Sequence, residues 1–392
     1  MLGDPIKNAQ QFLKDNKIDG WLVYDYLNSN PVFNKLLSSH GKITRPVFFL
    51  ITPTDLPYLI THHVDLGRFN EKHVHPLPYN NRKEMLAHLR DVLINTNRVA
   101  MEYSPFNQLP RISRVDAGTV ELIQSLNTTV ISSADLVQYA TQTLDETQIE
   151  SHLQAGQKLG KIVHQAFEMI GANLNKEISE FDVAEYIREL FSKNDLTTYD
   201  GPVVAINENS ADPHYEPLEK AKTFKKGDWI LIDLWAKNNK PNSIYSDITW
   251  VAHIGNEVPL RHKEVFDIVT EARDKSLHFL EQRFASQQPI EGWEVDQIAR
   301  TIINNYGYGE YFTHRLGHGI GEEVHSEGVN LDSWETHDTR SIMIGSTFSI
   351  EPGIYLPGNF GVRSEIDVHV GIKGPYASSP VQTDIVLINP NS

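Results

Sequence analysis

The chain has 392 residues, of which 40% are hydrophobic and 22% charged, values that are typical of globular proteins and compatible with two or three domains. Its 35 basic and 51 acidic residues give a formal net charge of −16, which argues against a nucleic-acid or anionic-membrane partner and leaves carboxylates available for hard cations. The sequence contains no cysteine, so disulfides, thiolate nucleophiles and iron–sulfur clusters are excluded.

The first residues of the chain lack the basic-then-apolar layout of a secretory signal, and no run of 18 apolar residues occurs anywhere in the sequence. The lack of cysteine does not fix the compartment, because a disulfide-free chain can fold in any of them. We therefore expect a cytoplasmic protein.

Residues 1–140 alternate between helical and extended patterns. Asp4 followed by Pro5 is typical of a helix N-cap and first helical position, and an apolar stripe at helical spacing follows. Short apolar runs predict strands, and longer amphipathic runs predict helices. The strands are expected at 21–26, 47–51, 58–61, 98–102 and 129–131, and the helices at 82–94 and 117–126. This alternation predicts a smaller N-terminal α/β domain.

Residues 145–392 have a different organisation, with helices grouped together and strands that pair in an antiparallel manner. Ser179 and Asp182 have the spacing of a capping box before an apolar run. Further helices are expected at 146–170, 260–284 and 295–306, and strands at 202–206, 229–236, 247–254 and after residue 347. This pattern predicts an α+β domain of roughly 250 residues.

Two aspartates stand in or beside apolar strands of this second domain. Asp233 lies in the middle of one, and Asp247 begins the next. An isolated buried carboxylate is unfavourable unless it is paired or bound to a metal, although a strand-end aspartate that reaches solvent is about equally plausible for Asp233 alone. If the two strands form a hairpin, both carboxylates can point to the same side, where they repel each other unless a cation lies between them.

The segment from residue 314 to 325 combines glycines with histidines. His314, His318 and His325 lie within twelve residues, and the glycines around His318 would let the backbone approach a ligand closely. A phosphate-binding loop is disfavoured, because no helix start with Lys or Ser/Thr follows.

Two glutamates follow near the C-terminus. Glu351 ends an apolar run before Pro352 and Gly353, and Glu365 follows Arg363 by two residues. Strand alternation would place Arg363, Glu365 and Asp367 on one face. That face could equally be an exposed, charged strand edge with a surface ion pair of little energetic weight.

Four carboxylates and one imidazole form a candidate metal-binding set: Asp233, Asp247, His318, Glu351 and Glu365. Oxygen-rich sites with one nitrogen ligand suit manganese, cobalt or zinc rather than a metal selected by thiolates. Four carboxylates exceed the needs of a single ion and indicate two divalent cations. We expect Mn²⁺, with Co²⁺ or Zn²⁺ as alternatives.

In order and spacing, these residues resemble the pita-bread metallopeptidases, which include Xaa-Pro aminopeptidase, prolidase and methionine aminopeptidase, with creatinase as a relative without metal. The matching motifs are Gly-His-Gly-Ile-Gly around His318, Ile-Glu-Pro-Gly around Glu351 and Gly-Val-Arg-x-Glu around Glu365. The resemblance implies a pita-bread catalytic domain over 145–392, preceded by a creatinase-like α/β domain over 1–140, for which it rests on architecture alone.

The resemblance also implies residue roles in a peptidase that hydrolyses the bond before proline in Xaa-Pro peptides. The catalytic residues would be His325 at the scissile carbonyl, Glu351 as proton shuttle and His214 on the substrate side. Substrate-binding residues would be His214, His314, Arg363 and Trp235. The family likeness further implies a short peptide substrate and a homodimer.

Two departures from the family pattern concern the first ligand strand. The family usually has glycine two residues after the first aspartate, whereas this chain has Trp235, which shares the face of Asp233. The connection from Asp233 to Asp247 is also longer than usual. Both changes affect pocket shape and substrate length, and neither removes a ligand.

Several functional alternatives remain open from the sequence. The motifs are shared between Xaa-Pro dipeptidases and aminopeptidases, so they do not separate these activities, although a pocket narrowed by Trp235 favours short substrates. A metal-dependent hydrolase of another small amide is possible on the same fold. A non-catalytic binding module is disfavoured, because all five ligand residues of the family pattern are present.

Overall fold

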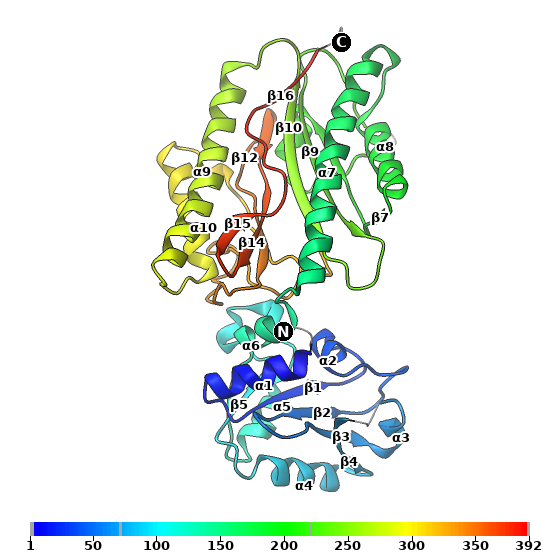
Figure 1. Cartoon of the computed structure of the whole chain (residues 1–392), viewed down its shortest axis with the longest axis vertical. Coiled ribbons are helices and arrows are strands. Elements are labelled where there is room, and N and C mark those ends of the chain that lie inside the picture. The colour runs from blue at the N-terminus through cyan, green and yellow to red at the C-terminus, as the bar shows by residue number, and fades with distance from the viewer. Residues whose placement is uncertain (1–3, 70–72, 219–220, 390–392) are drawn as a thin grey trace. The chain divides into compact units, whose positions relative to one another are not determined.

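The computed structural model describes residues 4–69, 73–218 and 221–389, and it divides the chain into two compact units, Met1–Thr143 and Leu144–Ser392 (Figure 1). The sequence analysis placed the domain boundary between residues 140 and 145. Among the described residues, no helix has both the length and the apolar character needed to cross a membrane.

The first unit contains a six-stranded mixed sheet with the order β4-β3-β2-β1-β5-β6. The strands are β1 (Gly20–Asp25), β2 (Val47–Ile51), β3 (Tyr58–His62), β4 (His75–Tyr79), β5 (Arg98–Met101) and β6 (Thr129–Ser132). Strand β1 runs parallel to β5 and antiparallel to β2. The sequence analysis missed β4, which contains Pro76 and Pro78 and lies at the sheet edge, where missing N–H donors are tolerated.

Helices cover both faces of this sheet. They are α1 (Pro5–Asp15), α2 (Pro31–Leu36), α3 (His63–Leu66), α4 (Arg82–Leu93), α5 (Ala117–Gln124) and α6 (Ala134–Thr141). One core cluster joins α1, α2 and α6 to the sheet, and a second joins α4 and α5 to it. The predicted start of α1 is confirmed, because the Asp4 side chain accepts hydrogen bonds from the first backbone N–H groups.

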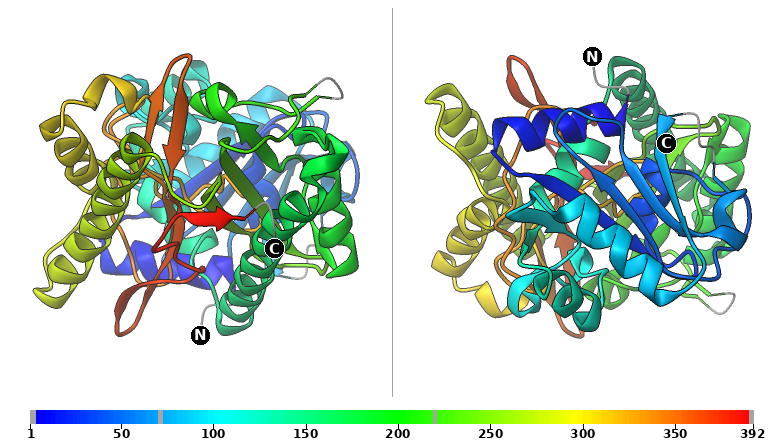
Figure 2. Two further views of the ribbon diagram at one scale, coloured as in Figure 1. Left: turned by 90° about the horizontal axis from the view of Figure 1, so that it is seen from above. Right: turned by 90° about the horizontal axis from the view of Figure 1, so that it is seen from below.

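The second unit is built from four long helices and ten strands among its described residues. The helices are α7 (Glu146–Asn173), α8 (Glu180–Lys193), α9 (Leu260–Ala285) and α10 (Gly292–Asn305). Figure 2 shows α7 and α8 on one side of the strands and α9 and α10 on the other. The predicted capping box is present, since Ser179 Oγ accepts from the Asp182 N–H while the Asp182 carboxylate accepts from the Ser179 N–H.

The strands of this unit form three sheets. One contains β7 (Leu196–Thr197), β8 (Val203–Ile206), β9 (Trp229–Asn238), β10 (Ser246–Ile254) and β16 (Val386–Ile388). The others are β11 (Thr347–Ile350) with β14 (Ile366–Gly371) and β15 (Gly374–Ala377), and β12 (Gly353–Leu356) with β13 (Phe360–Arg363). The pairings are antiparallel except that between β10 and β16. Short 3-10 turns lie at Pro105–Asn107, Pro110–Ile112, Leu174–Lys176, Asn207–Ala211 and Gly309–Tyr311.

Side-chain alternation along β9 separates two cores. Ile230, Ile232 and Leu234 pack in the cluster formed with α7 and α8. Trp229 and Leu231 point the other way, into the cluster formed with α9, α10 and β11–β14. Asp233 lies on the same face of β9 as Trp229 and Leu231. Its carboxylate therefore points into the interior of the unit, where it is shielded from water.

The expectation that Arg363, Glu365 and Asp367 alternate along one strand is wrong. Strand β13 ends at Arg363 and pairs with β12, whereas β14 begins at Ile366 and pairs with β11. Glu365 lies where the chain passes from one sheet to the other. The alternative of an exposed, charged strand edge is also wrong, because these three residues are 4%, 1% and 0% exposed.

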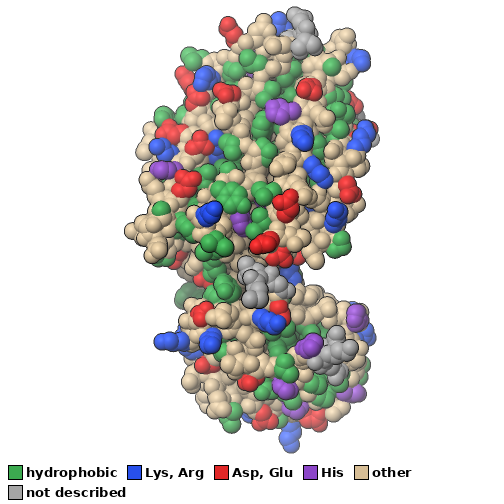
Figure 3. Space-filling model, viewed as in Figure 1, with side chains coloured by type: hydrophobic (Ala, Val, Ile, Leu, Met, Phe, Trp, Pro, Cys, Tyr) green, Lys and Arg blue, Asp and Glu red, His purple; other side chains and the backbone are tan. Residues whose placement is uncertain are grey.

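Charged side chains of both signs are intermixed over the face shown in Figure 3. On that face, neither sign of charge gathers in one large patch.

A buried ion pair on α10 holds the segment that leads into the glycine-rich loop. The Asp296 carboxylate, 0% exposed, accepts two hydrogen bonds from the Arg300 guanidinium and one from the Leu316 N–H. Arg300 also donates to the carbonyl oxygens of Phe312 and His314. The pair therefore fixes the backbone just before His318.

We expect Asp296→Ala to lower the free energy of unfolding of the second unit by about 3–5 kcal/mol, because it leaves the Arg300 charge buried without its partner. Urea unfolding followed by tryptophan fluorescence measures this, since five of the six tryptophans lie beyond residue 143. The control is Asp267→Ala, which breaks an exposed pair with Lys263 and should cost less than about 1 kcal/mol. Equal costs for the two variants would contradict the role of Asp296.

Candidate metal centre

The hairpin of β9 and β10 brings two aspartates to one face. In the antiparallel register, Asp233 lies opposite Thr249, and Trp235 lies opposite Asp247. Because Asp233 and Trp235 share a strand face, both carboxylates project to the same side. The hairpin expected from the sequence is confirmed. The alternative that Asp233 lies at a strand end is wrong, because it stands in the interior of β9.

His318 is held against β11 by its two neighbouring glycines. Its N–H donates to Ser349 Oγ, and the Ser349 N–H donates to the His318 carbonyl oxygen. A Cβ atom on Gly317 would lie 2.0 Å from the Ser349 carbonyl oxygen, and one on Gly319 would lie 2.8 Å from the backbone of Gly328. These glycines therefore allow backbone to approach backbone at this point.

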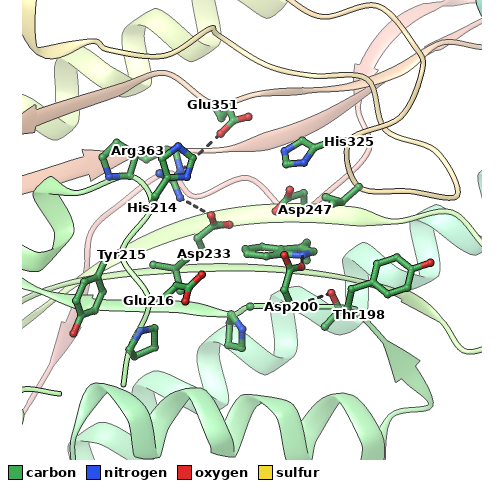
Figure 4. Close-up of a pocket in the computed structure, with 18 of the residues that line it drawn as sticks. Thr198, Asp200, His214, Tyr215, Glu216, Asp233, Asp247, His325, Glu351 and Arg363 are labelled. Atoms are coloured by element: carbon green, nitrogen blue, oxygen red, sulfur yellow. Dashed lines mark hydrogen bonds and ion pairs between the residues drawn. The ribbon is translucent and has the colours of Figure 1, made fainter. Parts of the chain in front are cut away.

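Five side chains from separate segments meet in the interior of the second unit. His318 Nε2 lies 3.3 Å from Glu351 Oε1 and 3.8 Å from Asp247 Oδ2. Ligand atoms of Asp247, His318 and Glu365 all lie within 4.8 Å of one another. Figure 4 shows Asp233, Asp247 and Glu351 around one space, with His325 beside it.

Three carboxylate oxygens in this cluster are buried without a hydrogen-bond partner among the described residues: Asp233 Oδ1, Asp247 Oδ1 and Glu365 Oε1. An ionised carboxylate oxygen removed from water in this way costs several kcal/mol unless a cation or a proton binds it. Oxygen ligands with one imidazole fit a divalent cation such as Mn²⁺, Co²⁺ or Zn²⁺. The side chains present therefore fit a metal site.

The electrostatics of the cluster favour a bound cation. Burial, reinforced by the charges of Glu365 and Asp233, raises the pKa of Asp247 well above its usual range. Burial likewise raises the pKa of Glu365 and brings that of Glu351 to about 7. Burial lowers the pKa of His318 well below 6.5, so its imidazole stays neutral and keeps a lone pair for a metal.

Arg363 supports the cluster from its buried side. Its guanidinium donates to Asp233 Oδ2, to Thr249 Oγ1 at 2.9 Å and to the Tyr355 hydroxyl at 2.9 Å. Thr249 Oγ1 in turn donates to Glu365 Oε2 at 2.7 Å. Arg363 therefore orients two of the carboxylates.

The supporting side chains were partly accessible to sequence analysis. Thr249 shares a strand face with Asp247, so alternation could have identified it. Tyr355, which accepts from Arg363, and Ser349, which donates to Glu351 Oε1, carry no comparable local signal.

The cluster opens into a pocket of about 890 Å³. Its lining includes His214, His314, His325, Trp235 and Arg363. His214 and His325 are exposed, and the His325 ring lies 4.2 Å from that of His318, centroid to centroid.

His314 is engaged on both ring nitrogens, with the Arg315 carbonyl oxygen at 2.6 Å and the Tyr355 hydroxyl at 2.7 Å. Burial, together with the Arg363 charge, lowers its pKa to about 3, so the imidazole is neutral. The structure thus places every residue that the sequence analysis selected in or beside one pocket, but Arg363 and His314 already have protein partners there.

The sequence of residues 154–371 matches the model of metallopeptidase family M24. An Xaa-Pro dipeptidase of Pyrococcus horikoshii is 32% identical over 234 residues, which cover 58% of this chain and 62% of that protein. The match therefore spans less than two thirds of this relative.

Solved structures resemble the whole chain. A dipeptidase from Mycobacterium ulcerans superposes with a TM-score of 0.72 at 19% identity, covering 98% of this chain and 97% of that one. An X-Pro aminopeptidase from Thermotoga maritima superposes with a TM-score of 0.61 at 25% identity, covering 98% of this chain and 100% of that one. The fold is therefore the pita-bread arrangement of these peptidases, with a smaller α/β unit before it.

We expect the affinity for Mn²⁺ to fall as the pH is lowered below about 7, because the raised pKa values of Asp247, Glu351 and Glu365 keep protons on the metal-free site that a cation must displace. His318 stays neutral over this range and does not oppose the trend. Calorimetric titration at about pH 7.5 and about pH 5.5, in buffers of different ionisation enthalpy, measures affinity and proton release together.

Glu365→Gln should weaken this binding, whereas Asp267→Asn on the exposed surface of α9 should leave it unchanged. An affinity that is the same at both pH values, without proton release, would contradict the assignment.

Proposed function

Because the chain belongs to metallopeptidase family M24, we propose that it is a metal-dependent exopeptidase that hydrolyses the bond before proline in Xaa-Pro peptides. It would act as an Xaa-Pro dipeptidase or an Xaa-Pro aminopeptidase. The activities named for two of its relatives, an Xaa-Pro dipeptidase and an X-Pro aminopeptidase, support both forms.

The observation that carries the proposal is the set of unpartnered carboxylate oxygens on Asp233, Asp247 and Glu365 beside the neutral imidazole of His318. With Glu351, these residues would hold two divalent cations, most favourably Mn²⁺. The chemistry that such cations supply is polarisation of the substrate carbonyl and acidification of water. A homodimer and a cytoplasmic location are finer parts of the same proposal and rest on the sequence analysis alone.

Two residues of this chain would act on the scissile bond. His325 lines the pocket beside His318 and would donate a hydrogen bond to the oxyanion that develops on the scissile carbonyl. Glu351, with its pKa raised to about 7, is suited to take a proton from the attacking water and pass it to the leaving nitrogen. The nitrogen of an Xaa-Pro bond belongs to a tertiary amide, so it must be protonated as the bond breaks.

The proline side of the substrate would lie at His214. Its exposed imidazole lines the pocket near Arg363 in Figure 4 and could hydrogen-bond the substrate on the leaving-group side. His314 and Arg363 would shape this end, with Arg363 contributing positive charge while it stays paired with Asp233. Trp235 would bound the opposite end of the pocket and favour short substrates.

The direct test is hydrolysis by protein reconstituted with Mn²⁺, offered an Xaa-Pro dipeptide, a matched longer Xaa-Pro peptide and a control without proline. We expect cleavage of at least one proline peptide before its proline and no cleavage of the control. Cleavage of the dipeptide alone identifies a dipeptidase, and cleavage of the longer peptide identifies an aminopeptidase. Failure on all three with metal bound contradicts the proposal and favours another amide substrate.

The matched variants for this test are Glu365→Ala and Glu264→Ala. The first removes a ligand and should abolish metal-dependent turnover. The second removes an exposed glutamate on α9 and should leave turnover intact. Bound metal is measured in the same samples, because a non-catalytic binding module would retain little. Full activity of Glu365→Ala would contradict the assignment of Glu365 as a metal ligand.

A further inference from the structure

The loop from Thr198 to Pro202 is anchored on the indole of Trp235. Asp200 Oδ1 accepts a hydrogen bond from Trp235 Nε1 at 3.0 Å. Gly201 adopts a φ of +72° and lies so close to the ring that a Cβ atom there would be 2.6 Å from Trp235 Cζ2. The position of the indole and that of the Asp200 carboxylate are therefore fixed by each other.

This pair lies on the side of the cluster away from His214. Figure 4 shows His214 and Arg363 on one side of Asp233, and Asp200 and Thr198 on the other. If the proline of a substrate lies at His214, the residue before it extends toward Trp235 and Asp200. The indole and the carboxylate thus form the wall that the N-terminal residue meets.

The Asp200 carboxylate has no cationic partner among the described residues. Its Oδ1 meets a neutral indole N–H, and its Oδ2 has no hydrogen bond or ion pair there. Each of the three arginines that line the pocket forms an ion pair with another acidic residue. They pair as Arg188 with Glu185, Arg315 with Glu335 and Arg363 with Asp233. A negative charge therefore remains available in this part of the pocket.

We propose that Asp200, positioned by Trp235, binds the cationic side chain of the substrate's N-terminal residue, so that Lys-Pro and Arg-Pro substrates are preferred. This inference rests on the proposed function and names its substrate class. The stem of lysine or arginine packs on the indole face, where its positive charge is also favourable. The charged end then reaches Asp200.

The distance from the scissile bond to Asp200 favours a contact of Asp200 with the side chain of the N-terminal residue rather than with the α-ammonium of the substrate. Asp200 meets the outer edge of the indole rather than the backbone of β9, and Asp233 and Trp235 are already separated by about 6.6 Å along the strand. The α-ammonium stays beside the scissile carbonyl and hence close to Asp233 and Asp247. The long stem of lysine can span the further distance to Asp200.

The experiment compares Lys-Pro with norleucine-Pro, which has the same stem without the charge. Because Asp200 is exposed, we expect the protein reconstituted with Mn²⁺ to prefer Lys-Pro in kcat/KM by about two- to fivefold, the effect of an ion pair at an exposed carboxylate. Asp200→Asn should bring this preference close to unity. Trp235→Phe keeps a ring but loses the N–H that holds Asp200, and it should reduce the preference in part.

The control is Asp195→Asn, which neutralises an exposed acid outside the pocket and should leave the preference unchanged. A wild-type protein without preference for Lys-Pro would overturn the inference. So would an Asp200→Asn variant that loses the same factor on both peptides, since that result places the α-ammonium at Asp200.

A binding measurement separates this inference from the proposed function. Calorimetry with lysinamide and norleucinamide should show tighter binding of the lysine compound to the wild type and no difference with Asp200→Asn. If neither the dipeptides nor a longer Xaa-Pro peptide is cleaved, the proposed function fails, and the two amides then decide the inference by themselves. Equal binding of the two amides to the wild type would overturn it.

Discussion

The mutual repulsion of buried carboxylates is the constraint on which the catalytic unit depends. Asp233, Asp247, Glu351 and Glu365 face one another away from water, and three of their oxygens have no partner among the described residues. Arg363 compensates part of this charge through Asp233, but one guanidinium cannot neutralise four carboxylates. Without a cation, the raised pKa values of Asp247, Glu351 and Glu365 let protons relieve part of the repulsion. The proposed function assigns that place to divalent cations.

The fold brings these carboxylates together because strands of different sheets place them in the same interior of the second unit. The inner face of β9 is apolar at Trp229 and Leu231 and acidic at Asp233, while its outer face packs on α7 and α8. Glu365 enters at the crossing between β13 and β14, and His318 enters on a loop fixed by Ser349 of β11. Because each proposed ligand comes from a different segment, the cluster forms only when the whole unit is folded.

The sequence predicted those parts of the structure that follow from local periodicity and motif. Alternation in 229–236 predicted the hairpin face, the spacing of Ser179 and Asp182 predicted a capping box, and motif spacing selected the clustered side chains. The strand β4 was missed because its prolines act against local strand preference. The position of Glu365 between two sheets, and the contacts of Asp200 with Trp235, depend on distant pairing that local patterns do not encode.

The most direct test of the account is a crystal structure of the protein grown with Mn²⁺, using anomalous scattering to locate the metal. The account predicts two anomalous peaks about 3.5–4 Å apart, coordinated by Asp233, Asp247, His318, Glu351 and Glu365. Peaks absent from this cluster, or found only on surface carboxylates, would contradict the claim that the repulsion among these side chains exists to bind divalent cations.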